Sequence, residues 1–208
     1  MLLKVCQPCQ RRLNTVFESP ASILLKEMMD GAVIDLTPRQ QVLVGGWAAK
    51  TGMLLILART DIAWMDRMLR HYLLHMLKEG TPPANSTVRI AYLSNDLKPP
   101  GTSFIPPGWV DVLPAAESIV SIISVPGLIA EVIVAPVAVT RSFADMTQDD
   151  DRFVLVWPPQ VPNQRWPPPI LLGPLDSEAI RDEWGHTDWH GNFPAVDAQR
   201  WTESNDPS

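Results

Sequence analysis

The strongest constraint on this chain is a long apolar run, SIVSIISVPGLIAEVIVAPVAV, which covers Ser118 to Val139. A run of this length is sufficient to span a bilayer as a helix. However, Pro126-Gly127 lies at its centre, Glu131 follows, and β-branched residues dominate both halves. These features favour two buried strands joined by a tight turn over one continuous helix. The sequence therefore predicts a β-hairpin and no membrane partner.

The overall composition is that of a globular protein. The chain has 208 residues, of which 46% are hydrophobic and 19% charged, enough for one domain with a real core or for two small lobes. Its net charge of -6 argues against broad, sequence-blind binding to nucleic acid, which needs a basic face. The two cysteines and the lack of a secretory signal after Met1 predict a cytoplasmic protein with reduced thiols.

Three helices are expected in the first 80 residues. The first covers Leu13 to Met29, and Pro20 is expected to divide it, with Ser19 as the N-cap of the second piece. The third covers Asp61 to Leu77, carries an apolar stripe, and is expected to end at Gly80.

The second helix has the clearest start signal. Thr37 as N-cap, Pro38 at the first helical position and Gln40 three residues after Thr37 match a capping box. The helix should run to about Leu57, and it is apolar nearly all round, which predicts a central, buried position. Gly45-Gly46 inside it costs about 1 kcal/mol for each glycine relative to Ala. We therefore expect a neighbouring backbone to approach closely there.

Strand signals follow Thr81, separated by Pro-rich turns, and predict an antiparallel sheet. They cover Thr87–Leu93, Trp109–Leu113, Ile119–Val125, Leu128–Val134 and Phe153–Trp157. The first alternates like a half-buried strand. The segment from Trp157 to Pro169, WPPQVPNQRWPPP, should be extended and wrap around the sheet. Trp157 and Trp166 are expected to close over the sheet as core rather than stack on a ligand.

The expected fold is α+β, with an N-terminal helical lobe of about three helices packed on a C-terminal antiparallel β-sheet with Pro-rich extended segments. Four segments are expected: a CxxC knuckle and helix start in 1–18, the helical lobe in 19–80, the β lobe with its Pro-rich wrap in 81–175, and a short helix with a poorly ordered tail in 176–208. Trp47, Leu54, Leu69 and the strands around Pro126-Gly127 should form the joint core.

Cys6-Gln7-Pro8-Cys9 is the candidate site. Two thiolates two residues apart can chelate one zinc ion, and tetrahedral coordination then needs two more ligands. A redox pair and plain thiols remain open alternatives, although a redox CxxC should follow a strand and begin a helix within a βαβ fold, a pattern that this sequence lacks. Lys4, Arg11 and Arg12 surround the cysteines and form a candidate basic patch for nucleic acid.

The motif order CxxCQxxLNxxFE, then LTPRQQVLVGGWAAKTGMLL, then strands and paired Trp-Pro-Pro segments resembles a group of uncharacterised bacterial proteins, common in actinobacteria. Their longer members look like HNH-type endonucleases, in which a first CxxC and a histidine precede a second CxxC and a helix. The resemblance runs from Cys6 to about Leu175. It implies that Cys6 and Cys9 correspond to the second pair of zinc ligands, followed by an accessory domain.

The catalytic half of that pattern has no counterpart in this sequence, because five residues precede Cys6. In HNH chemistry a histidine acts as general base while a metal steadies the phosphate. The resemblance therefore implies an incomplete zinc site, no catalytic residue and a nucleic-acid-associated role. A misplaced start codon and a lost nuclease half both remain open. The alternative is a non-enzymatic module that binds a protein partner through the sheet and its Trp-Pro surface.

Three further clusters carry metal-ligand residue types, and a purely structural interpretation is favoured for each. They are His71 with His75, His186 with His190, and the acidic run from Asp145 to Arg152. Tyr72 stands where a zinc protease would have its glutamate, and the acidic run lacks the ligand spacing of a calcium loop. Adding His186 and His190 to the two cysteines would give a Cys2His2 site from distant parts of the chain.

Overall fold

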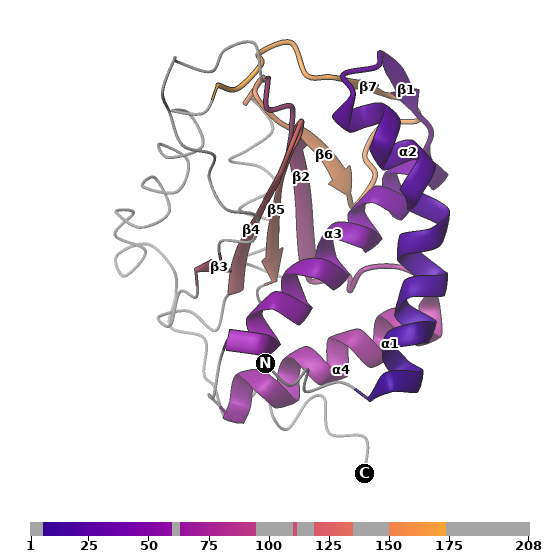
Figure 1. The fold of residues 1–208 in the computed structure, drawn as a ribbon, viewed down its shortest axis with the longest axis vertical. Helices are drawn as coiled ribbons and strands as arrows, with labels where there is room; N and C mark the ends of the chain where they lie inside the picture. The colour runs from indigo at the N-terminus through magenta and orange to yellow at the C-terminus, as the bar shows by residue number, and fades with distance from the viewer. Residues whose placement is uncertain (1–5, 60–62, 95–109, 112–118, 135–149, 174–208) are drawn as a thin grey trace.

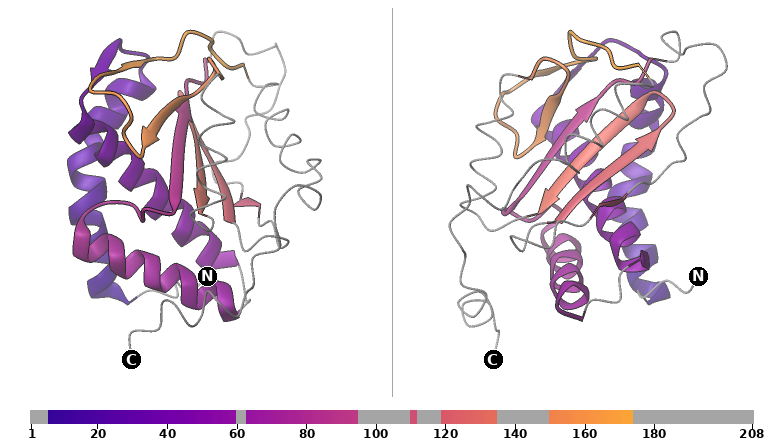
Figure 2. Two further views of the ribbon diagram at one scale, coloured as in Figure 1. Left: turned by 180° about the vertical axis from the view of Figure 1, so that it is seen from behind. Right: turned by 90° about the vertical axis from the view of Figure 1, so that its left-hand side faces the viewer.

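The structure is a computed structural model that describes residues 6–59, 63–94, 110–111, 119–134 and 150–173. In this part of the chain, N-terminal helices cover one face of an antiparallel sheet (Figures 1 and 2). The predicted α+β class is therefore confirmed. The predicted short helix and tail after residue 175 lie outside the described residues.

The first helical rod is unbroken, so the expected division at Pro20 is wrong. It comprises α1 (Gln7–Leu13), the π-helical turn η1 (Asn14–Glu18) and α2 (Ser19–Met29). Within η1 the backbone N–H of Ser19 reaches the carbonyl of Asn14, five residues back. This wider turn lies directly before Pro20, whose ring would meet a carbonyl in a regular helix. Ser19 has helical backbone angles and is not an N-cap.

The predicted capping box is confirmed at the start of α3 (Pro38–Arg59), directly after the short strand β1 (Ile34–Leu36). The backbone N–H and the hydroxyl of Thr37 donate to the Gln40 side-chain carbonyl at 2.9 and 2.8 Å. The Gln40 N–H returns a bond to the Thr37 hydroxyl at 3.4 Å. The helix then crosses the molecule between the α1–α2 rod and the sheet (Figure 1), as its all-round apolar pattern predicts.

Gly45 and Gly46 do mark close approaches to α3, but mainly of side chains rather than of a backbone. A Cβ atom added to Gly46 would overlap the ring of Phe17 in η1. One added to Gly45 would lie 3.0 Å from the Cβ of Trp157 and 3.7 Å from the Val156 carbonyl oxygen. The two glycines therefore let α3 pack tightly against the π-helical turn on one side and the sheet on the other.

Helix α4 (Ala63–Glu79), the last of the described helices, ends where the sequence predicts. Gly80 follows it with a φ of 72°, and its N–H donates to the Met76 carbonyl at 2.9 Å. Leu69, Leu73 and Met76 are buried along one face of this helix. Of the residues expected in the joint core, Leu69 is fully buried, and Trp47 and Leu54 pack against the core from partly buried positions.

The main sheet has the strand order β3-β4-β5-β2-β6, with every neighbouring pair antiparallel. Its strands are β2 (Ser86–Ala91), β3 (Val110–Asp111), β4 (Ile119–Val125), β5 (Leu128–Val134) and β6 (Val154–Trp157). The apolar run forms the β4–β5 hairpin, with Pro126-Gly127 as its turn and a φ of 78° at Gly127. The predicted hairpin is confirmed, and none of the described helices is long and apolar enough to cross a membrane.

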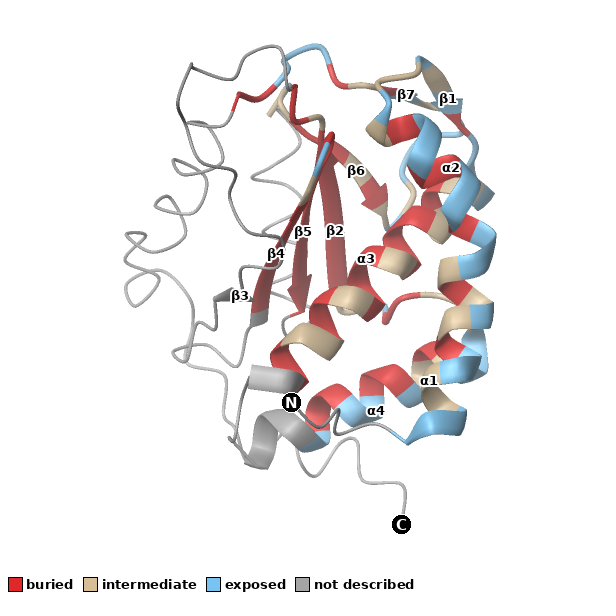
Figure 3. Cartoon of the chain, in the orientation of Figure 1, coloured by how far each residue is buried: buried red, intermediate tan, exposed pale blue. Residues whose placement is uncertain are grey.

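Strand β2 is buried on both faces, so the predicted half-buried strand is wrong. All six of its residues are buried (Figure 3). Val88 and Ile90 face the helices, whereas Ala91 belongs to a second apolar cluster with Ile129 and Phe153 on the other face. The apparent alternation in the sequence came from Arg89, which is itself buried because it is paired across the sheet.

The Pro-rich segment does more than wrap the sheet. Strand β7 (Gln164–Trp166) pairs with β1 in a second, two-stranded sheet that the sequence did not predict. Trp166 is fully buried, and its indole N–H donates to the Met28 carbonyl at 3.1 Å. The indole N–H of Trp157 donates to the Pro83 carbonyl at 3.0 Å. Both tryptophans are therefore structural, as expected.

Candidate metal centre

The first turn of α1 positions both cysteines. Cys6 is the N-cap residue with extended backbone angles, and Pro8 lies in the first turn. The first helical hydrogen bond runs from the Gln10 N–H to the Cys6 carbonyl at 2.9 Å. Leu13, at the end of α1, is fully buried. This anchor fixes the helix against the core and leaves its first turn at the edge of the molecule.

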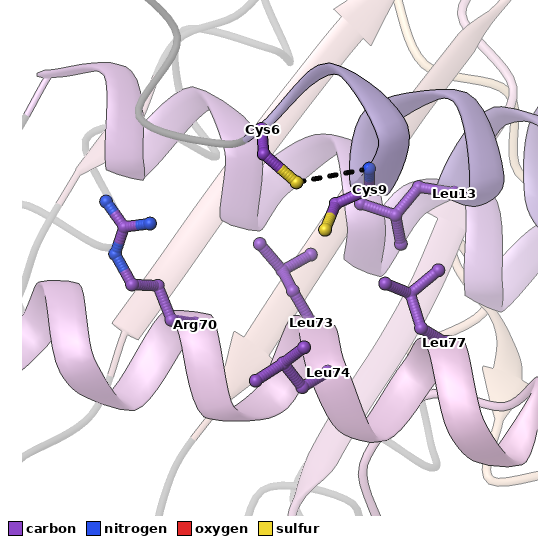
Figure 4. A pocket seen from close by; sticks show the side chains of 7 residues that line it. All are labelled: Cys6, Cys9, Leu13, Arg70, Leu73, Leu74 and Leu77. Carbon is purple, nitrogen blue, oxygen red and sulfur yellow. Dashed lines mark hydrogen bonds between the residues drawn. The ribbon is translucent and has the colours of Figure 1, made fainter.

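The two thiol groups are held close together by the helical turn. The backbone N–H of Cys9 donates to the Cys6 sulfur at 3.3 Å. Figure 4 shows both sulfur atoms on the side of α1 that faces α4. Cys6 is exposed, Cys9 is half-buried, and neither forms a disulfide. The turn therefore presents two sulfur atoms in one direction.

The sulfur atoms line a small cavity between α1 and α4 (Figure 4). Its volume is about 180 Å³, and its lining consists of Cys6, Cys9, Leu13, Arg70, Leu73, Leu74 and Leu77. Leu74, one of the lining residues, is 60% exposed. One water molecule needs roughly 10–15 Å³ of such space, so the cavity can hold a metal ion with additional ligands. Four leucines give it a largely apolar wall.

The two thiols differ in acidity. Hydrogen bonds from the Cys9 side chain and from the Cys9 backbone N–H lower the pKa of Cys6. The pKa of Cys9 is raised, because its thiol bonds to Cys6, burial disfavours its thiolate, and the Cys6 charge repels a second one. The positive charge of Arg12 opposes this increase. Cys6 therefore deprotonates first, and a metal ion that binds both sulfur atoms must displace the Cys9 proton.

A tetrahedral zinc site needs four ligands, and Cys6 and Cys9 are two residues of a suitable type. Within the described ranges, no group of three or more His, Cys, Asp or Glu residues is placed to hold a metal ion. His71 and His75 lie on α4, the first exposed and the second half-buried. For the redox alternative, Cys6 does begin a helix, and residues 1–5 before it lie outside the described part.

Two of the three predicted basic residues lie beside the thiols. Arg11 and Arg12 are both exposed, on the turn of α1 that follows Cys9. Lys4 lies outside the described residues, as do His186 and His190. Of the acidic run, Asp150 to Arg152 are described. The Asp150 carboxylate there accepts hydrogen bonds from the Arg152 guanidinium at 2.8 and 2.9 Å.

One buried polar cluster was missed by the sequence analysis. The Arg89 Nε atom donates to Glu131 at 2.5 Å, with the two side chains 7% and 0% exposed, and Asp150 lies 3.5 Å from the same guanidinium. The guanidinium also stacks 4.0 Å from the centre of the Phe153 ring. The sequence did contain a signal for this cluster. Two predicted strands each carry one charged residue, Arg89 in one and Glu131 in the other, and the two charges have opposite signs. Buried charges of this kind need a partner.

Comparisons with known proteins add nothing to this geometry, because no family model, no curated protein and no solved structure matches the chain. The resemblance to HNH-type nucleases therefore stays a prediction. In the structure, the CxxC pair lies at the start of a helix, with Cys6 as its N-cap and Cys9 in its first turn.

Proposed function

We propose that this chain is a zinc-binding, nucleic-acid-associated protein, related to HNH-type nucleases but without a catalytic site of its own. Cys6 and Cys9 supply two zinc ligands, and Arg11 and Arg12 contact phosphate groups beside them. The observation that carries the proposal is the shared orientation of the two sulfur atoms, with exposed arginines on the next turn of the same helix. No catalytic residue is included, because no histidine of this sequence matches the catalytic one.

The charge of the molecule limits the binding mode. A chain with a net charge of -6 does not attract DNA over its whole surface, so binding depends on a local patch. Two arginines contribute roughly two phosphate contacts. Each such contact adds about 0.9 to the slope of log affinity against log salt concentration. The expected binding is weak and has a shallow salt dependence.

The first test measures zinc. The purified, reduced chain should bind zinc, and the Cys6→Ser, Cys9→Ser variant should not, as measured by elemental analysis after dialysis. Unchanged metal content in the variant would remove the two cysteines from any metal site.

The second test measures DNA binding by fluorescence anisotropy with a short labelled duplex. The Arg11→Glu, Arg12→Glu variant should bind at least about tenfold more weakly at low salt, with a salt slope lower by about 2. The matched control combines Arg39→Glu with one other reversal of charge at an exposed basic residue away from α1. Arg39 suits this purpose because it is exposed at the start of α3, at the other end of the α1–α2 rod (Figure 1). Equal affinities of the double variant and the wild-type chain would contradict the proposed interface.

The alternative function is a protein-interaction module. The tryptophans that suggested it face inward, but Val161, Ile170 and Leu171 in the Pro-rich segment are 41%, 49% and 40% exposed. This function predicts that Ile170→Ser, Leu171→Ser abolishes binding of a partner isolated with the wild-type chain and leaves DNA affinity unchanged. Retention of that partner by the variant would count against the module.

A further inference from the structure

The described residues do not complete the coordination of a zinc ion. A structural zinc ion takes four ligands, each sulfur at about 2.3 Å, and the cysteine pair supplies two. In the part of the chain that the structure describes, no third His, Cys, Asp or Glu stands with them. Resting on the zinc binding proposed above, we propose that the other two ligands are Cys6 and Cys9 of a second copy of this chain. One zinc ion then joins two chains through four sulfur atoms.

The position of the pair suits a contact between identical copies. Cys6 is exposed at the end of a helical rod, and the cavity that both sulfur atoms line is open to solvent beside it. A two-fold axis through the metal places the same surface of each chain against itself. Each chain then contributes an equal pair of ligands, and the tetrahedral geometry of zinc is satisfied by two pairs related by that axis.

Charge also favours this end of the molecule for the contact. A zinc ion with four thiolates carries a net charge of -2, which follows from adding one doubly positive ion to four single negative charges. Arg11 and Arg12 are exposed beside each pair, and Arg70 lines the cavity. Two acidic chains, each of net charge -6, repel one another over most of their surfaces. The arginines around the metal reduce this repulsion at the place where the sulfur atoms meet.

The apolar wall of the cavity also favours contact with a second chain. Leu74 lines the cavity and is 60% exposed, and the half-buried Leu77 lines it as well. A second chain that approaches along the metal axis covers Leu74. It also removes water from the metal–thiolate bonds, which strengthens the attraction between the ion and its ligands.

The test combines mass and metal content on the full chain in the presence of a reductant. Light scattering after size-exclusion chromatography with added zinc should give twice the chain mass of 23.1 kDa, with one zinc ion for every two chains. A chelator should return the monomer. The Cys6→Ser, Cys9→Ser variant should remain a monomer without zinc, whereas Ser22→Ala, an exposed change on the same rod, should dimerise as the wild type does.

The other outcomes separate the two proposals. One zinc ion per chain in a monomer would contradict the proposal that a second copy supplies ligands, but it would leave zinc binding intact. The missing ligands would then lie within the chain. No bound zinc overturns both. A dimer that persists in chelator, or in the double-serine variant, overturns a metal-mediated contact. Circular dichroism of that variant verifies folding, and the wild-type chain in chelator provides the same comparison without any substitution.

Discussion

At the scale of single residues, the two thiols should react at different rates. Cys6 is the more exposed, and hydrogen bonds from Cys9 lower its pKa, whereas the pKa of Cys9 is raised. Since the thiolate is the nucleophile, iodoacetamide near neutral pH should modify Cys6 roughly tenfold faster than Cys9 in the metal-free chain. Peptide mapping by mass spectrometry after short exposures measures both rates. Equal rates would show that the hydrogen bond does not distinguish the two sulfur atoms in solution.

Two glycines offer a matched pair of substitutions. Gly127 and Gly80 have φ values of 78° and 72°, so alanine at either should cost about 1–2 kcal/mol in backbone strain. A Cβ atom at Gly127 would also overlap the Met29 carbonyl, whereas one at Gly80 has nothing within 4 Å. Gly127→Ala should therefore reduce the free energy of unfolding by about 1–3 kcal/mol more than Gly80→Ala does.

Urea denaturation of both variants measures this difference. Because the backbone strain is common to both positions, the excess loss at Gly127 reports the packing of the hairpin turn against the end of α2. Equal losses would mean that the turn and α2 are not in contact in solution.

At the scale of elements, an ion pair joins the π-helical turn to α3. The Lys50 ammonium lies 2.5 Å from the Glu18 carboxylate, with side-chain exposures of 3% and 45%. Glu18→Gln leaves a buried charge without its partner and should cost about 1–3 kcal/mol, less than for a fully buried pair because Glu18 meets solvent. Lys50→Met replaces the buried charge with an apolar chain and should be close to neutral.

The opposite order of those two costs would show that the lysine itself, rather than its pairing, supports the packing of α3. Thermal or urea unfolding of the two single variants decides between these outcomes. The double variant gives the coupling energy between the side chains.

The elements that the sequence predicted correctly are those specified by local interactions. The capping box at Thr37 and the hairpin turn at Pro126-Gly127 depend on residues no more than a few positions apart. The β1–β7 pairing was missed because Ile34 and Trp166 meet only through the tertiary fold. The continuity of the helix through Pro20 was missed because a π-helical turn has no sequence signal as plain as that of proline.

The sequence likewise predicts the part of the candidate site that depends on local spacing and misses the part that depends on tertiary packing. The cysteine pair and the exposed arginines of α1 are visible in the sequence, because their spacing within one segment sets which side chains gather there. The α4 wall of the cavity, with Arg70 and Leu74, depends on how two distant helices pack. No spacing rule connects those residues to Cys6, so the sequence does not predict the cavity.

At the scale of the whole molecule, the two faces of the sheet are stabilised differently. The face toward the helices is mostly apolar, whereas the opposite face adds the Arg89–Glu131 pair to its apolar cluster. Asp150 and Arg152 extend this pair from the turn before β6. When a carboxyl group in such a network has a different pKa in the folded and unfolded states, the stability of the fold depends on pH.

The lowered pKa of Asp150 determines the direction of this pH dependence. Burial alone would raise the pKa of its carboxyl group, but hydrogen bonds from Arg152 and the charges of Arg152 and Arg89 outweigh burial and lower it. A carboxyl group with a lower pKa in the folded state than in the unfolded state, about 3.9 there, stabilises the fold above that value. The contribution is lost as pH falls through the lower, folded-state pKa.

Urea midpoints measured from neutral pH down to about pH 3 should therefore fall less steeply for Asp150→Asn than for the wild type. Asp151→Asn removes the same charge at the exposed neighbour and should keep the wild-type slope; a flattened curve there instead would assign the effect to net charge rather than to the Asp150 contacts.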